Sequence, residues 1–99
     1  MKLDYRKEGT ELTVLLNGEL NTLTAPELSA LLETQLPGIM SLILDFTDCD
    51  FVSSAGIRVL LGTFKELKGR KGHMCLQNVG EVFMDVLENT GLDAVFDLR

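Results

Sequence analysis

The chain alternates between segments whose apolar residues recur at every second position and segments whose apolar residues recur at helical spacing. Residues 12–17 show the two-residue period that is typical of a strand, and residues 28–36 place leucines at the spacing of a helix. Residues 42–46 are almost continuously apolar, which indicates a central strand covered on at least one face. Strands separated by helices of this length require right-handed parallel crossovers, so the pattern predicts an α/β domain.

The same alternation continues through the rest of the chain. The further elements that we expect are a hairpin strand at 3–6, a helix with an apolar stripe at 57–67, a strand at 73–77, a helix with Val82, Phe83, Val86 and Leu87 inward, and an optional short strand at 95–98. The predicted fold is therefore α/β, with the order β-β-α-β-α-β-α and a mixed sheet of four to five strands joined by parallel crossovers. We expect residues 1–99 to form one domain, because a chain of 99 residues rarely supports two cores.

Helix boundaries are predicted by three short patterns. Residues 24–27 (Thr-Ala-Pro-Glu) have the form of a capping box, with proline in the first turn, where no helical donor is lost. Residues 78–81 (Asn-Val-Gly-Glu) have the same form, with asparagine in the capping role. Gly91 suits the C-terminal cap of the last helix.

The charge and the cysteine content restrict the class of partner and the compartment. A net charge of −6 opposes binding to nucleic acid or anionic lipid. It favours a partner with a basic docking face, although an acidic domain without such a partner has the same composition. No apolar run approaches the ~20 residues of a membrane span, and residues 1–7 lack the apolar core of a signal peptide. Two cysteines without a CxxC motif fit a reduced compartment, so we expect a cytoplasmic protein without membrane insertion.

The sequence contains no recognisable set of catalytic residues, such as a nucleophile with a base placed to activate it. His73 is the sole histidine and stands where a strand begins, so we interpret it as an exposed strand-end residue rather than a catalytic base. Asp45, Asp48 and Asp50 follow the central strand and could hold Mg²⁺, but we favour a solvated acidic loop, which could also belong to a docking surface. We expect no enzyme activity, no metal ion and no cofactor. A small hydrolase with Ser54 as nucleophile is the least favoured alternative.

The junction at residues 50–57 allows two compatible roles for its serines. Ser53 and Ser54 precede a helix, where serine hydroxyls accept hydrogen bonds from unpaired backbone N–H groups. The same helix N-terminus tolerates an added phosphate, because its N–H groups and its dipole favour negative charge.

Three segments together resemble a known family. Residues 51–61 (Phe-Val-Ser-Ser-Ala-Gly-Ile-Arg-Val-Leu-Leu) resemble the phosphorylation segment of STAS domains, specifically of bacterial anti-sigma factor antagonists. Residues 18–28 resemble the segment that leads into the first helix of that family, and residues 82–96 resemble its C-terminal helix and closing strand. The resemblance covers essentially the whole chain, in order.

The resemblance implies a partner switch. In this family the unmodified antagonist binds an anti-sigma factor that is also a serine kinase, and this releases the sigma factor. The kinase phosphorylates the antagonist, which breaks the complex, and a PP2C-type phosphatase restores it. The phosphorylated serine of the family falls on Ser54; ATP and Mg²⁺ belong to the kinase. The implied partner-binding residues are Asn21, Thr22, Ser53, Ser54, Ala55, Gly56 and Arg58.

The sequence departs from the common family pattern at three of these positions. Ser53 stands where many members have aspartate, and Ala55 replaces a second hydroxyl. Asn21 also stands where aspartate is frequent, so it either contacts the kinase or caps a turn. Arg58 either contacts the partner or stays solvated. An alternative function is that of a non-phosphorylated STAS subunit that docks on the ATPase of a membrane transporter; the presence of Ser54 favours the phosphorylated switch.

Overall fold

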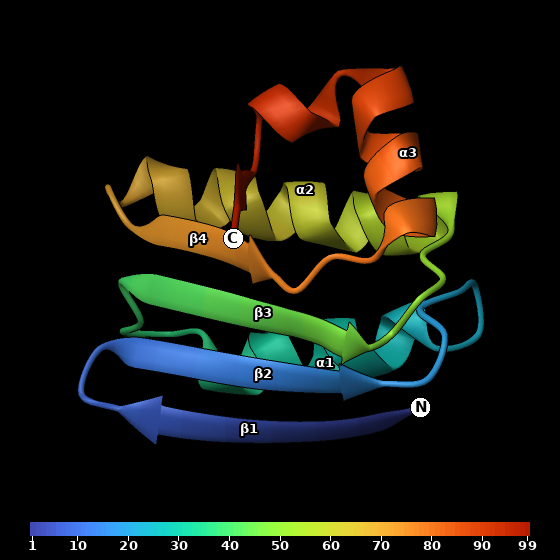
Figure 1. Cartoon of the computed structure of the whole chain (residues 1–99). Helices are drawn as coiled ribbons and strands as arrows, with labels where there is room; N and C mark the ends of the chain where they lie inside the picture. Colours follow the sequence, from blue (N-terminus) through green and yellow to red (C-terminus); the bar gives the residue numbers. More distant parts are fainter.

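The computed structural model describes residues 1–99 and contains one five-stranded sheet whose strand order, β1-β2-β3-β4-β5, equals the order along the chain (Figure 1). The strands are β1 (Lys2–Glu8), β2 (Glu11–Asn17), β3 (Ser41–Asp48), β4 (His73–Gln77) and β5 (Asp97–Leu98). β1 and β2 form an antiparallel hairpin, and every later neighbour pairs in parallel. The predicted mixed sheet with parallel crossovers is therefore confirmed, with five strands.

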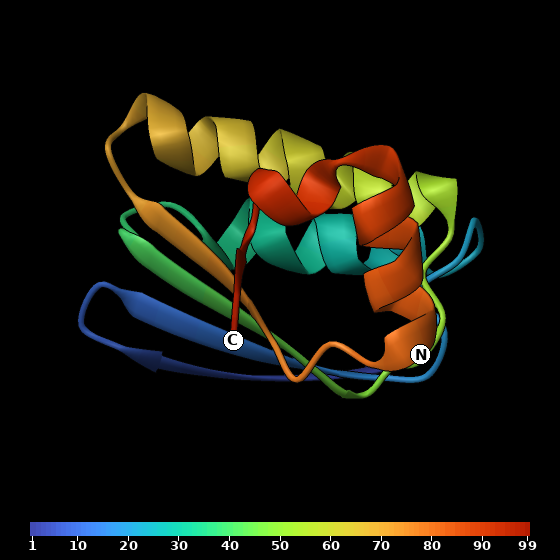
Figure 2. The same ribbon diagram turned by 45° about the horizontal axis from the view of Figure 1, so that its top comes forward.

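The helices lie on one side of this sheet. They are α1 (Ala25–Gln35), α2 (Ser54–Gly69), α3 (Glu81–Thr90) and the short 3₁₀ helix η1 (Leu92–Ala94). α1 and α2 lie side by side over the sheet, and α3 crosses near the first turns of α2 (Figure 2). No helix is both long enough and apolar enough to cross a membrane.

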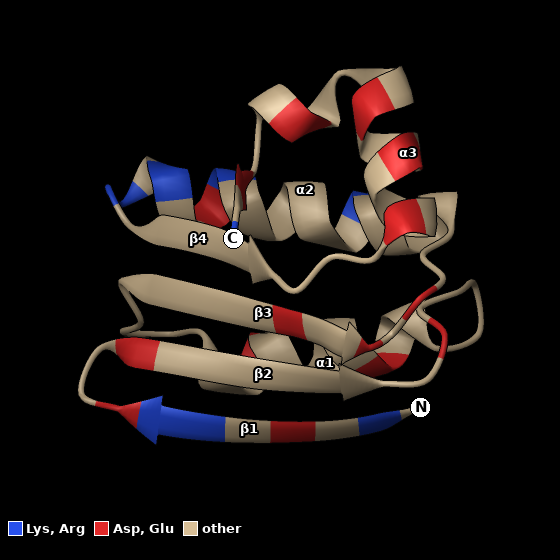
Figure 3. Ribbon diagram, viewed as in Figure 1, with Lys and Arg blue, Asp and Glu red and all other residues tan.

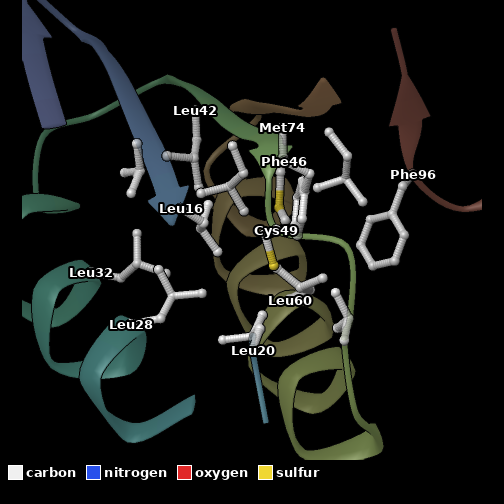
Figure 4. Close-up of a cluster of buried hydrophobic side chains, with 14 of the residues drawn as sticks. Leu16, Leu20, Leu28, Leu32, Leu42, Phe46, Cys49, Leu60, Met74 and Phe96 are labelled. Atoms are coloured by element: carbon white, nitrogen blue, oxygen red, sulfur yellow. The ribbon is translucent and has the colours of Figure 1, made fainter. Parts of the chain in front are cut away.

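The core lies between the sheet and the helices. On β3, Leu42, Leu44 and Phe46 are at most 2% exposed, as expected for the central strand. Figure 4 shows side chains of the strands meeting those of α1 and α2 in one apolar cluster. On β2, Val14 is fully buried whereas Leu15, on the other face, is 45% exposed. The sheet is therefore covered on one face only.

The apolar stripe predicted for the second helix is confirmed and is wider than the leucines alone indicate. Leu60 and Leu67 are buried, and Gly56 and Thr63 complete the same face at helical spacing. The hydroxyl of Thr63 donates to the carbonyl oxygen of Val59 at 2.8 Å, which satisfies this polar group within the core.

Neither predicted capping box forms, although Thr24 is the N-cap residue of α1 and proline stands in its first turn, as predicted. The hydroxyl of Thr24 makes no cap for α1, because it donates to the carbonyl oxygen of Glu19 and accepts from the N–H of Asn21 instead. Gly80 rather than Asn78 is the cap residue of α3. Asn78 adopts a positive φ of 58°, which lets its side chain donate to Asp45 at 3.2 Å.

One side chain of α3 points the other way from the prediction. Phe83 and Leu87 are buried as expected, and Val86 is half-buried. Val82, in the first turn of α3, is 61% exposed. The predicted C-terminal cap at Gly91 is confirmed by its left-handed conformation, with φ at 75°.

Hydrogen bonds to the side chain of Asp45 connect β3 to the segment that follows β4. Its Oδ1 accepts from the N–H and the hydroxyl of Thr47 at 2.9 and 2.6 Å, and from Asn78. Burial by itself would raise the pKa of Asp45, but the hydrogen bonds from Thr47, Asn78 and Gln77 outweigh it and lower this pKa.

We predict that Asp45→Asn lowers the free energy of unfolding at pH 7 by about 1 kcal/mol. Because the pKa of Asp45 lies below the ordinary 3.8, its ionised form contributes stability above that pH, and this contribution is lost as the pH falls through the lowered pKa. The difference between wild type and variant, measured by urea denaturation, should therefore shrink below about pH 4. Asp48→Asn, at an exposed position at the end of β3, serves as the control; a difference that does not change with pH would contradict this role.

Candidate functional site

Two loops that are distant in sequence run side by side at the edge where the parallel strands end (Figure 1). The N–H of Leu20 donates to the carbonyl oxygen of Phe51 at 2.9 Å, and the N–H of Ser53 donates to that of Leu20 at 2.8 Å. The N–H of Gly18 bonds to the carbonyl oxygen of Asp48 at 3.0 Å. These bonds extend the parallel pairing of β2 and β3 beyond the strands, as the bridge between Leu20 and Val52 shows.

The first turn of α2 rests directly on this pairing. Leu20 is fully buried and Val52 is 6% exposed, and Gly56 lies buried above them. A Cβ atom on Gly56 would lie 2.8 Å from Cγ of Leu20 and 3.0 Å from Cγ1 of Val52. Glycine is therefore required here for the close approach of the helix to the loops. Gly56 positions the site but is not on its surface.

The two serines of the junction have different environments. Ser53 is the N-cap of α2, and its Oγ accepts from the N–H of Gly56 at 3.3 Å. Ser54 is the first residue of the helix and is exposed, and none of the side-chain hydrogen bonds of the chain involves its hydroxyl. The cap is thus supplied by one serine while the hydroxyl of the other faces solvent.

Asn21 caps the turn that precedes α1. Its Oδ1 accepts from the backbone N–H of Leu23 at 2.9 Å and of Thr24 at 3.1 Å. In return, the N–H of Asn21 donates to the hydroxyl of Thr24 at 2.8 Å. Asn21 and Thr24 thus form a capping box, whereas the sequence predicted one between Thr24 and Glu27. It agrees with the capping interpretation of Asn21, and Thr22 beside it is exposed.

Charge is distributed unevenly around the two serines. Arg58 is exposed, lies one turn after Ser54 and takes part in no ion pair. The other basic residues of α2 and of the segment after it lie at the far end of the helix, as the blue segments in Figure 3 show. The exposed acidic residues in the loops and first helix turns of this edge are Glu19, Glu27, Asp48, Asp50 and Glu81.

The exposed apolar side chains at this edge were not predicted from the sequence. Leu23 is 85% exposed, Val82 61% and Phe51 43%. They lie in the loop before α1, in the first turn of α3 and in the loop before α2, and all three elements meet at the same edge. Exposed apolar groups within an acidic rim are typical of a protein-binding surface. Leu23 could have been recognised by its place between two threonines outside any predicted element.

The other candidate side chains lie apart from this edge or have structural contacts. His73 is exposed at the start of β4, and its Nε2 lies 2.9 Å from Oδ2 of Asp97, which agrees with a strand-end residue. Cys49 and Cys75 are unpaired and buried, and burial raises the pKa of both thiols. No group of three histidine, cysteine, aspartate or glutamate side chains is arranged to hold a metal ion.

Comparison with known proteins identifies the family. The sequence pattern of the STAS domain matches residues 2–99, so the chain belongs to the STAS domain family. It is 33% identical over 97 residues to BtrV of Bordetella bronchiseptica, which carries the provisional name of anti-sigma factor antagonist; the match covers 97% of this chain and 84% of BtrV. It is 26% identical over 98 residues to the anti-sigma-B factor antagonist of Bacillus subtilis, covering 99% of this chain and 90% of that protein.

The fold agrees with this assignment. The phosphorylated form of the Bacillus cell fate determinant SpoIIAA superimposes with a TM-score of 0.78 at 21% sequence identity, covering 99% of this chain and 91% of SpoIIAA. The family resemblance and the fold class predicted from the sequence are therefore confirmed, and the chain stands among the anti-sigma factor antagonists of the STAS family.

We predict that Gly56→Ala destabilises the domain, because its Cβ atom would overlap the buried side chain of Leu20. Gly62→Ala in the same helix is the matched control, since its Cβ atom would meet nothing within 4 Å. Both changes gain helix propensity, so Gly56→Ala should unfold with about 1–3 kcal/mol less free energy than Gly62→Ala in thermal or urea denaturation. Equal stability of the two variants would show that the contact is not tight.

We predict that Asn21→Ala lowers the free energy of unfolding by about 1 kcal/mol, because two backbone N–H groups lose their acceptor. Asn21→Asp keeps an acceptor oxygen and should remain within about 0.5 kcal/mol of wild type. Urea denaturation of the three proteins gives the comparison. If Asn21→Ala is as stable as Asn21→Asp, the side chain does not act as a cap.

Proposed function

We propose that the protein is an anti-sigma factor antagonist that is switched by phosphorylation at Ser54. In its unmodified form it would bind an anti-sigma factor with serine kinase activity in the cytoplasm and so release a sigma factor. The kinase would then phosphorylate Ser54 and break the complex, and a PP2C-type phosphatase would restore the binding form. The chain is the substrate in this cycle and contributes no catalytic group.

The observation that carries the proposal is the environment of Ser54. Its hydroxyl is exposed at the first position of α2, and the helix N-terminus is already capped by Ser53. A phosphate on Ser54 would therefore displace no intrachain hydrogen bond and would lie at the positive end of the helix dipole. The names of the family members and the phosphorylated form of SpoIIAA support the same reading.

The surroundings of Ser54 explain how the modification could break a complex. The phosphate adds about two negative charges to an edge that already carries Glu19, Asp48 and Asp50. Within an interface this dianion must be matched by new donors or pay the cost of desolvation, which amounts to several kcal/mol. Because each ~1.4 kcal/mol changes affinity tenfold, the modified form would bind much more weakly.

The proposed docking surface combines the exposed site residues with the apolar side chains of the same edge. Its proposed members are Thr22, Leu23, Phe51, Ser54, Arg58 and Val82, with Ala55 half-buried at their border. Asn21, Ser53 and Gly56 would act through them, since these three hold the loops and the helix start in place.

We predict that Ser54→Asp retains the fold but binds the partner kinase at least about tenfold more weakly than wild type, because a charge enters the centre of the interface. Thr10→Asp, in the exposed turn between β1 and β2 at the opposite end of the sheet, adds the same charge away from this edge and should bind like wild type. Isothermal titration calorimetry measures binding, and circular dichroism checks the fold. Undiminished binding by Ser54→Asp would count strongly against the switch.

The same set of proteins locates the phosphate. Ser54→Ala should bind the kinase as well as wild type but should gain no phosphate in the presence of ATP, as read by intact mass. Full phosphorylation of Ser54→Ala would move the modified residue elsewhere, with Ser53 as the first candidate.

A further inference from the structure

β1 leaves one long edge of the sheet unpaired. It pairs with β2 alone, along all seven of its residues, and stands at the outer margin of the sheet (Figure 1). Six of its residues are exposed and Leu3 is half-buried. A row of backbone N–H and C=O groups therefore faces away from the sheet, ready to pair with another strand. The opposite edge, β5, has only two residues.

The charges of this edge strand alternate in sign. Lys2, Asp4, Arg6 and Glu8 share the open face of the sheet, because successive side chains of a strand point to opposite faces. Charged residues on an edge strand usually oppose pairing with other chains. Here their order makes the strand complementary to itself.

The complementarity extends along the whole strand in one antiparallel register. When two copies of a strand pair about a two-fold axis, residues directly opposite each other have their side chains on the same face of the sheet. The axis must therefore pass at the position of a residue and not between two residues. With the axis at Tyr5, Lys2 faces Glu8 of a second copy and Asp4 faces Arg6, and all seven residues pair. Axes at Asp4 or Arg6 place these residues opposite themselves, and like charges that face each other directly are unfavourable.

We propose that β1 is a homodimer interface whose occupant is β1 of a second copy of this chain, in the register centred on Tyr5. The pairing joins the two five-stranded sheets edge to edge with the helices of both copies on the same side. Tyr5, which is 46% exposed, then packs against Tyr5 of the other copy. Because the strands of the two copies run in opposite directions, the edges that carry Ser54 face opposite ways and remain accessible. The interface does not depend on the proposed function.

The dimer is expected to be weak. A single pair of edge strands buries less area than a standard interface, so we expect a Kd on the order of 100 µM. Sedimentation velocity of the full chain from about 10 µM to about 1 mM should show the mass rising from the 10.9 kDa monomer towards the dimer. A wild-type protein that stays monomeric over this range would overturn the proposal.

Charge reversal tests the register. Asp4→Arg and Arg6→Asp each place like charges opposite one another, so each variant alone should remain monomeric. An equimolar mixture of the two should dimerise, because both arginines of one chain then face both aspartates of the other. The double variant Asp4→Arg/Arg6→Asp should also dimerise. Asp93→Arg, exposed on η1, changes the net charge as Asp4→Arg does and should dimerise like wild type.

The outcomes separate this interface from any other. Dimerisation of both single variants at the wild-type concentration would place the interface elsewhere. A mixture that associates no more than its separate components would refute the register. Circular dichroism of each variant shows whether it is folded, and the double variant tests the register within one chain if either single variant folds poorly.

Discussion

The close packing of α2 on the paired loops after β2 and β3 determines the geometry of the whole site. The loops are joined by backbone hydrogen bonds between Leu20 and its partners Phe51 and Ser53, which continue the parallel sheet beyond its strands. Gly56 then allows the first turn of the helix to lie on Leu20 without a gap. The exposed position of Ser54 follows from these two contacts. A buried framework of leucines therefore orients a surface that is itself accessible.

Some polar side chains at the site cap backbone N–H groups, whereas the hydroxyl of Ser54 does not. Ser53 and Asn21 satisfy backbone N–H groups at the start of a helix and of a turn, so their side chains are occupied within the chain. The hydroxyl of Ser54, next to Ser53, makes no side-chain hydrogen bond within the chain and is exposed. A modification of Ser54 can consequently change the charge of the surface while the caps that hold it remain in place. This division makes a reversible switch compatible with a stable fold.

Hydrophobic periodicity was sufficient to predict the order of strands and helices. A strand brings every second side chain to the core and a helix every third or fourth, so the spacing of the apolar residues distinguishes the two. It also identified the second helix, whereas Ser54 was singled out by the family resemblance of the segment at the start of that helix. The helix caps were predicted less well, since capping depends on which backbone groups the fold leaves unpaired. The side chain of Asn78, for example, donates a hydrogen bond to Asp45, which lies 33 residues earlier on β3. The hydroxyl of Thr24 accepts from the N–H of Asn21 and forms no capping box with Glu27. The pairing of Leu20 with Val52 and the outward direction of Val82 arise from tertiary contacts that have no local signature.

The central claim is that phosphate on Ser54 controls binding. Its most direct test is a calorimetric comparison of the unmodified protein with protein that carries phosphoserine at position 54, installed during synthesis so that no kinase is needed. Both forms are titrated with the partner anti-sigma factor. We predict tight binding of the unmodified form and at least a roughly tenfold loss of affinity for the phosphorylated form. Equal affinity of the two forms would contradict it.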